Sequence, residues 1–198
     1  MSKPDDLSDY RRKRDTTKSG EPGGAGKGRR SGRAFVVQRH DASSLHFDFR
    51  LQVGEVLASW AVPKGPSTDP REKRLATRTE DHPLEYADFE GAIPEGEYGA
   101  GTVIVWDAGS YENLTERDGE PVSMEDGLEA GHLKVCLEGE KLTGAYALTQ
   151  TKMRGDDSNW LLLKLDDEGA DRRRNPTRTE PRSVRSGRTN ADIRRQED

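Results

Sequence analysis

Residues 45–62 read LHFDFRLQVGEVLASWAV, and this stretch predicts two antiparallel strands joined by a tight turn. Along its first half every second residue is apolar, and the residues between are polar. Successive side chains of a strand point to opposite faces, so Leu45, Phe47, Phe49 and Leu51 share one face. The other face carries His46, Asp48, Arg50 and Gln52. The turn VGE at 53–55 leads into the second strand, VLASWAV at 56–62.

Six more segments of the chain have the same strand character, and most are bounded by Gly, Pro, Asp or Asn. They are AFVVQ (34–38), RLATRT (74–79), GTVIVWD (101–107), HLKVCLE (132–138), GAYALTQT (144–151) and NWLLLKL (159–165). The segment SMEDGLEAG (123–131) favours a short helix. We therefore predict a mostly β fold: a closed or nearly closed antiparallel β-barrel of about eight strands, with short helical elements and flexible tails.

The apolar residues concentrate in one region, which divides the chain into three parts. Residues 1–33 are polar and glycine-rich and are predicted to form a flexible basic arm. Residues 34–167 would form the barrel domain. Residues 168–198, with the cluster RRR at 172–174, are predicted to be a disordered charged tail.

Charge follows the same division. Residues 1–33 hold ten basic and five acidic side chains, whereas residues 34–165 hold 13 basic and 24 acidic ones. An acidic body argues against broad sliding along nucleic acid, so a bound polyanion must meet a local cationic patch or a metal ion. A single cysteine and the lack of a long apolar run or signal peptide favour a cytoplasmic protein without a membrane span.

The polar face of the strand at 45–52 is a candidate functional site. The pattern His46-x-Asp48-x-Arg50 offers two metal ligands and a guanidinium suited to phosphate or carboxylate, although an exposed polar face with an incidental histidine is equally compatible. His40 ends the preceding strand, and the connection DASS could bring it beside His46. Two imidazoles and a carboxylate would then form a transition-metal site with positions left open for substrate.

Further residues could join this site. His82 precedes Pro83, which favours an extended or turned backbone at a barrel mouth. Lys64 and Arg74 could help Arg50 to neutralise a phosphate, although solvent-exposed charge is the ordinary role of such residues. His132 begins a strand and is expected to be structural. The glycine-rich GAIPEGEYGAG (91–101) lacks the Gly-Lys-Ser/Thr of a nucleotide-binding loop.

Several long motifs resemble, in order and spacing, the 3′-phosphoesterase domain of bacterial DNA ligase D and its stand-alone bacterial and archaeal relatives. They are QRHDASSLHFDFRL, SWAVPKGPS, KRLATRTEDHPLEYADFEG and IPEGEYGAGTVIVWD, followed by GEKLTGAYAL and NWLLLKLDD. The resemblance runs from about Tyr10 to Asp167. It implies a barrel-like β fold and manganese-dependent repair of DNA 3′ ends, in which a 3′-terminal ribonucleoside and then the remaining 3′-phosphate are removed to leave a 3′-hydroxyl.

The resemblance also implies roles for particular residues. His40, His46 and Asp48 match the metal ligands of that family. Arg50 and His82 match residues that contact the scissile phosphate, and Tyr86 matches another residue needed for activity. Lys64 and Arg74 match supporting cations. Arg14, Asp15 and Glu21 match a functional stretch that precedes the barrel.

Two other functions fit parts of the pattern. His46, Asp48 and His82 have the form of the two-histidine-one-carboxylate triad of non-haem Fe(II) oxygenases, which would leave His40 without a role. Alternatively, the chain could be a non-catalytic module that holds DNA ends through its basic arm. Because the sequence contains no ligase or polymerase motifs, an ATP-dependent DNA ligase, Ku or a repair polymerase would act in trans.

Overall fold

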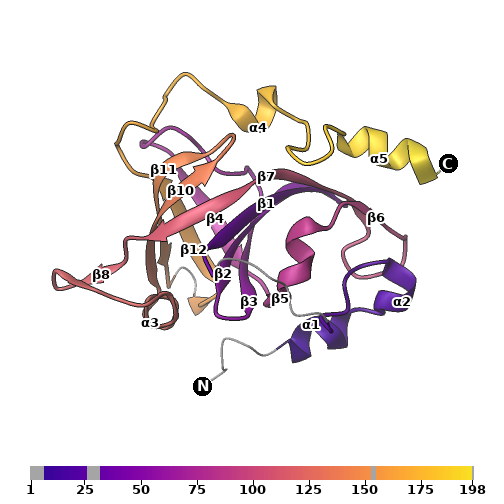
Figure 1. Cartoon of the computed structure of the whole chain (residues 1–198), viewed down its shortest axis with the longest axis horizontal. Coiled ribbons are helices and arrows are strands. Elements are labelled where there is room, and N and C mark those ends of the chain that lie inside the picture. Colours follow the sequence, from indigo (N-terminus) through magenta and orange to yellow (C-terminus); the bar gives the residue numbers. More distant parts are fainter. Residues whose placement is uncertain (1–6, 26–31, 153–154, 198) are drawn as a thin grey trace.

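Eight antiparallel strands close into a barrel in the computed structural model, which describes residues 7–25, 32–152 and 155–197 (Figure 1). Around the barrel the order is β1 (Ala34–Asp41), β2 (Leu45–Val53), β3 (Val56–Val62), β4 (Lys73–Arg78), β12 (Asn159–Lys164), β11 (Thr143–Gln150), β10 (His132–Gly139) and β7 (Gly101–Asn113). The pairing of β7 with β1 closes the ring. These eight strands coincide with the eight predicted segments, so the predicted fold class is confirmed.

The barrel interior is filled by apolar side chains. Phe47, Phe49 and Leu51 of β2 point inward and are at most 3% exposed, as the alternation predicts. Leu45 is 40% exposed, because it begins the strand at the rim of the barrel. The three tryptophans lie in the same core, where Trp60 and Trp160 meet edge to face with ring centroids 5.5 Å apart. Large side chains of the described residues thus fill the interior of the barrel.

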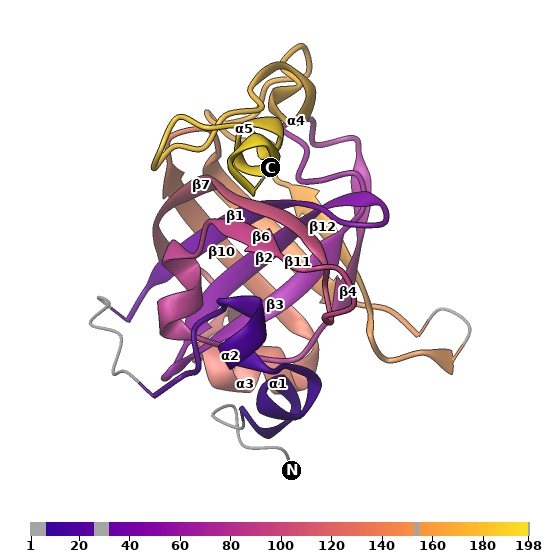
Figure 2. The same cartoon turned by 90° about the vertical axis from the view of Figure 1, so that its right-hand side faces the viewer.

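A second, smaller core covers the outer face of β1 to β3. Helices α1 (Ser8–Lys13) and α2 (Thr16–Ser19) and the 3₁₀-helix η1 (Leu84–Asp88) lie over this face (Figure 2). Tyr10, Leu57 and Tyr86 pack together there, and Tyr10 is fully buried. Residues 7–25 of the predicted flexible arm are therefore folded against the barrel, whereas residues 1–6 and 26–31 lie outside the described residues.

Short elements extend the sheet at its edges. β5 (His82–Pro83) pairs with β3, which places His82 beside Leu57, and β6 (Gly91–Ile93) pairs with β7. β8 (Glu116–Arg117) and β9 (Glu120–Pro121) form a separate hairpin. The predicted short helix is α3 (Met124–Ala130), which begins at the N-cap Ser123.

The C-terminal segment differs from the prediction of a disordered tail. It contains α4 (Pro176–Thr179) and α5 (Asn190–Glu197) and lies along the barrel (Figure 1). Asn190 is 2% exposed, and its amide donates to the carbonyl oxygens of Arg39 and Thr102. Arginines of this segment pair with carboxylates of the acidic barrel, as in Arg194–Asp41 and Arg188–Glu90. Local composition suggests disorder here because it does not reveal these distant partners.

Within the described residues, no helix combines the length and the apolar character that a membrane crossing requires.

Candidate metal and phosphate site

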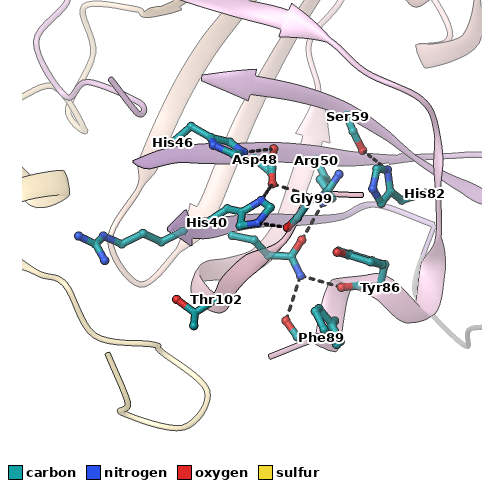
Figure 3. Close-up of polar contacts among 12 residues, drawn as sticks. His40, His46, Asp48, Arg50, Ser59, His82, Tyr86, Phe89, Gly99 and Thr102 are labelled. Atoms are coloured by element: carbon teal, nitrogen blue, oxygen red, sulfur yellow. Dashed lines mark hydrogen bonds and ion pairs between the residues drawn. The ribbon is translucent and has the colours of Figure 1, made fainter. Parts of the chain in front are cut away.

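Strand register brings three potential metal ligands together on the outer face of the barrel. His40 of β1 lies directly opposite His46 of β2, and Asp48 follows two residues later on the same face. The Asp48 carboxylate is 3.6 Å from His40 Nδ1 and 3.4 Å from His46 Nε2 (Figure 3). One ligand atom from each of the three residues lies within 4.8 Å of the others. The arrangement therefore fits a single metal ion.

The outer nitrogens of both imidazoles contact backbone carbonyls. His40 Nε2 is 2.7 Å from the Gly99 carbonyl oxygen, and His46 Nδ1 is 3.2 Å from that of Ser44. A carbonyl can only accept, so these nitrogens carry protons, which leaves His40 Nδ1 and His46 Nε2, the nitrogens nearest Asp48, to ligate a metal ion. Metal-bound histidines are oriented by such contacts. Two imidazoles and a carboxylate suit Mn²⁺, Fe²⁺ or Zn²⁺.

The electrostatics of the cluster keep Asp48 ionised. Burial alone would raise the pKa of this carboxyl, but the Arg50 guanidinium and the two imidazoles hold it well below its usual range. Burial likewise disfavours a charged His46, but the hydrogen bond and negative charge of Asp48 outweigh it and raise the His46 pKa. Asp48 therefore stays ionised and can serve as an anionic metal ligand.

Arg50 connects the ligand cluster to a phosphate-sized opening. Its side chain is 3% exposed, NH2 is 3.4 Å from Asp48 Oδ2, and Nε donates to Gln38 Oε1 at 2.7 Å. Gln38 is itself fixed because its amide donates to the carbonyls of Tyr86 and Phe89. Arg50 NH1 is buried and has no hydrogen-bond partner among the described residues. A buried guanidinium donor without a partner is suited to bind an anion.

The N-terminal arm adds a second arginine to the site. Arg14 donates to Glu21 at 3.1 Å and to Glu80 at 2.7 Å, and all three side chains are at most 6% exposed. Its guanidinium also lies 4.4 Å from the ring centroid of Tyr10. These contacts dock the arm onto the loop that precedes β5.

His82 is held as a neutral imidazole. Its Nδ1 is 2.9 Å from the Glu80 carbonyl oxygen, which only accepts, and its Nε2 is 3.2 Å from Arg14 NH2, which only donates. Burial and the nearby charges of Arg50 and Arg14 lower the His82 pKa well below its usual value. Nε2 therefore carries the lone pair, which accepts from Arg14.

Tyr86 and Glu21 form the wall beside His82. The Tyr86 hydroxyl donates to Glu21 Oε1 at 2.8 Å, and burial together with that carboxylate raises the Tyr86 pKa well above its usual value. Tyr86 thus stays protonated, and its ring lies 4.9 Å from the Arg50 guanidinium. Glu21 Oε2 is buried without a hydrogen-bond partner among the described residues.

These groups line one cavity of about 300 Å³, which brings together most of the predicted site residues. They are His40, His46, Asp48, Arg50, His82, Tyr86, Arg14 and Glu21. Asp15 does not line the cavity; it caps α2 by accepting from the Thr17 backbone N–H. Lys64 is exposed on the loop after β3, and Arg74 lines a different cavity.

Sequence reasoning missed four members of the site: Gln38, Glu80, Tyr98 and Gly99. Tyr98 lies at the cavity rim, where its ring is 48% exposed and within 5.3 Å of the charged groups of Lys13 and Arg14. An exposed aromatic in the glycine-rich stretch was the available signal for Tyr98. Strand register and tertiary contacts bring Gln38, Glu80 and Gly99 to the site, and a single sequence does not reveal such contacts.

Comparison with known proteins identifies the family. Residues 38–150 match the model of the DNA ligase D 3′-phosphoesterase domain. The chain is 52% identical over 169 residues to the multifunctional non-homologous end joining protein LigD of Pseudomonas aeruginosa, covering 84% of this chain and 19% of that protein. The corresponding proteins of Mycobacterium tuberculosis and Mycolicibacterium smegmatis are 47% and 44% identical, over 81% and 83% of this chain and 20% and 21% of theirs.

The chain belongs to the DNA ligase D 3′-phosphoesterase domain family. The family description denotes a hydrolase of phosphoester bonds, and the three-ligand cluster fits a metal-dependent member. The chain spans about one fifth of the length of these relatives.

Proposed function

We propose that the chain is a Mn²⁺-dependent phosphoesterase that heals DNA 3′ ends. It would remove a 3′-terminal ribonucleoside and then the remaining 3′-phosphate, and so leave a 3′-hydroxyl for non-homologous end joining. The observation that carries this proposal is the contact between the ligand cluster and Arg50. A buried guanidinium with a free NH1 touches Asp48, so one phosphate can meet both the metal ligands and the arginine.

His40, His46 and Asp48 would hold the metal, which supplies Lewis-acid polarisation of a phosphoryl oxygen. Arg50 NH1 would donate to another oxygen of the same phosphate and offset the charge that develops there. In the first step, water would replace the 5′-oxygen of the terminal ribonucleoside at phosphorus. In the second, it would replace the 3′-oxygen of the strand.

His82 and Glu21 supply the proton acceptors of the cavity. Neutral His82 has its one lone pair at Nε2, where it accepts from Arg14, so it could take the proton of the attacking water there only when that contact is released. Glu21 Oε2 has no partner among the described residues and could accept from a hydroxyl of the terminal nucleoside. Tyr86 and Arg14 would hold Glu21 and His82 in place through their hydrogen bonds.

The proposal also concerns partners. A DNA ligase, a repair polymerase and Ku would have to seal, extend or hold the healed end. The relatives are named as multifunctional end-joining proteins, and this chain matches only a fifth of each, so these activities would lie outside the residues described here.

The test uses a labelled primer–template duplex whose primer ends in one ribonucleotide. Metal-stripped protein is incubated with and without Mn²⁺, and the products are resolved at single-nucleotide length. We expect a shortened strand only with Mn²⁺, first with a 3′-phosphate and then with a 3′-hydroxyl. Binding of the duplex without any product would instead support the non-catalytic module.

Two variants test the assignment of residues. His46→Ala should lose Mn²⁺ binding, measured by calorimetry, together with turnover. The matched control is His132→Ala, which removes an exposed histidine of β10 far along the chain from the cluster. Retained Mn²⁺-dependent activity in His46→Ala would contradict the ligand assignment. The oxygenase alternative needs His82 as a ligand, and the grouped ligands include His40 instead.

A further inference from the structure

A second cationic cavity lies at one end of the barrel, apart from the residues that line the metal site. Its volume is about 180 Å³, and its charged lining comprises four arginines and two carboxylates: Arg74, Arg172, Arg173, Arg174, Asp69 and Glu72. Arg74 lies two residues before the buried Ala76 on β4, so both side chains point to the inner face of the barrel, and Arg74 reaches the cavity from there. The metal ligands lie on the outer face. Ser67 and Thr68 also line the cavity.

The arginine segment is held in place by the loop that precedes β4. The Thr68 hydroxyl shares its hydrogen between the carbonyls of Asp171 and Arg174, at 2.8 and 2.9 Å, and the Asp171 N–H donates to the Thr68 carbonyl at 2.9 Å. These bonds bracket Arg172 and Arg173 on both sides. The cationic wall of the cavity is therefore built by the fold.

Part of the positive charge in this cavity is not neutralised. Arg174 pairs with Glu180, and the carboxylates Asp69 and Glu72 are paired with Arg71 and Arg74. Arg74 Nε is buried and has no hydrogen-bond partner among the described residues.

Arg172 and Arg173 are exposed, and the charge of Arg172 acts on the Asp69 carboxylate, which is already paired with Arg71. Two exposed guanidinium groups and a buried donor without a partner among the described residues thus line one opening. This is the chemistry that recognises a phosphate group.

The cavity opens at the same end of the barrel as His46. Gly65 packs so closely between two segments that a Cβ there would lie 2.8 Å from the Phe47 ring and 2.6 Å from Thr177. Phe47 is the neighbour of His46 on β2, and Thr177 follows Pro176, which lines the cavity. Lys64, exposed next to Gly65, lies on this path.

We propose that the cavity formed by Arg74, Arg172 and Arg173 binds a backbone phosphate of the DNA strand whose 3′ end occupies the metal site. This inference rests on the proposed function, which names DNA as the polyanion. A volume of about 180 Å³ suits a phosphate group more than a whole nucleotide. Such a contact would also anchor DNA on a barrel whose residues 34–165 carry 24 acidic and 13 basic side chains.

The test measures binding of a fluorescent duplex with an ordinary recessed 3′-hydroxyl, which needs no turnover. Anisotropy titrations at several salt concentrations compare the full chain with Arg172→Ala/Arg173→Ala. The control Arg178→Ala/Arg195→Ala removes the same charge from exposed arginines that do not line the cavity. We expect about tenfold weaker binding and a log–log salt slope smaller by about 1 in the first variant, since each phosphate contact contributes about 0.9.

Two results would overturn the inference: equal losses in both double variants, which would reflect net charge alone, or no loss in either. A third result would also overturn it: inorganic phosphate binds the wild type but not Arg172→Ala/Arg173→Ala, while the salt slope of DNA binding is the same in both proteins. The cavity would then take free phosphate. If the wild type cleaves no primer yet the slope falls only in the first variant, the proposed hydrolysis fails while the DNA subsite stands.

Discussion

Arg14 offers the sharpest test of how the N-terminal arm is attached to the site. Its buried guanidinium joins Glu21 on the arm to Glu80 on the loop before β5, and those carboxylates are only 1% and 4% exposed. The substitution Arg14→Met keeps most of the apolar stem and removes the charge. Two buried carboxylates then lose their shared partner.

Breaking a buried ion pair by removing one partner costs about 3–5 kcal/mol, because the remaining charge stays buried. Lys13 still pairs with Glu80 at 3.0 Å in the variant, so we take the lower end, about 3 kcal/mol. At about 1.36 kcal/mol per factor of ten, the arm should open roughly 150-fold more often.

Amide hydrogen exchange of residues 7–25, followed by mass spectrometry, measures this opening directly. Arg12→Met is the matched control, because the side chain of Arg12 is 75% exposed and pairs only with Asp9 on the same helix. That change should alter exchange less than about threefold, as expected for a surface pair. Adding Glu21→Gln to Arg14→Met removes one of the unpaired charges and should restore part of the protection.

The reasoning would be refuted by equal exchange rates in Arg14→Met and Arg12→Met. It would also be refuted if Arg14→Met/Glu21→Gln exchanged faster than Arg14→Met alone. Either result would mean that the arm is held mainly by the apolar contacts of Tyr10 rather than by this charge network.

Three further predictions concern other parts of the molecule. Gly99 has φ +79°, so Gly99→Ala should displace the carbonyl that orients His40 and weaken Mn²⁺ binding, measured by calorimetry, about tenfold. The control Gly96→Ala, at φ +88° in open space, should leave Mn²⁺ binding unchanged. Equal Mn²⁺ affinities of the two variants would contradict this prediction. Burial lowers the pKa of Lys141 to about 8, so the unfolded chain binds more protons than the folded chain between pH 8 and 10.5. Stability to urea should therefore rise between pH 8 and 9.5, and Lys141→Met should abolish this rise. An unchanged rise in the variant would exclude Lys141 as its source. If a terminal base stacks on the exposed ring of Tyr98, Tyr98→Ala should raise KM for the ribonucleotide primer about tenfold, and Tyr98→Phe should leave KM unchanged. Equal KM values for these two variants would exclude stacking.

The fold follows from the sequence because each barrel strand is a short segment with an alternating or continuous apolar pattern, as in β10 and β3. β2 is the clearest case, since its inward residues are aromatic or aliphatic and its outward residues are polar or charged. The C-terminal segment could not be predicted in this way. Its order depends on contacts with residues 88 and 98 positions away in Asn190–Thr102 and Arg188–Glu90.

The site could be predicted where its residues lie close together in the sequence and belong to types that ligate metals. His40, His46 and Asp48 lie within nine positions, and antiparallel register makes them neighbours. Both the residue pattern and the family resemblance place Arg74 with Arg50 at the phosphate, whereas in the structure Arg74 faces the end of the barrel and lines a different cavity. The alternation in RLATRT does not indicate which of its two faces points into the barrel, so the sequence alone could not predict the direction of the Arg74 side chain.

The position of the site explains why the terminal segments matter. A barrel with a filled interior must hold the metal site on its outer face, and an exposed sheet face would leave His82 and Arg50 in water. The arm supplies the cover: Tyr10 packs against His82 and Tyr86, and Glu21 accepts from Tyr86. The family match begins at residue 38, yet this covering layer precedes it. The chemistry we propose therefore requires the arm as well as the barrel, because only together do they form the buried cavity around Arg50.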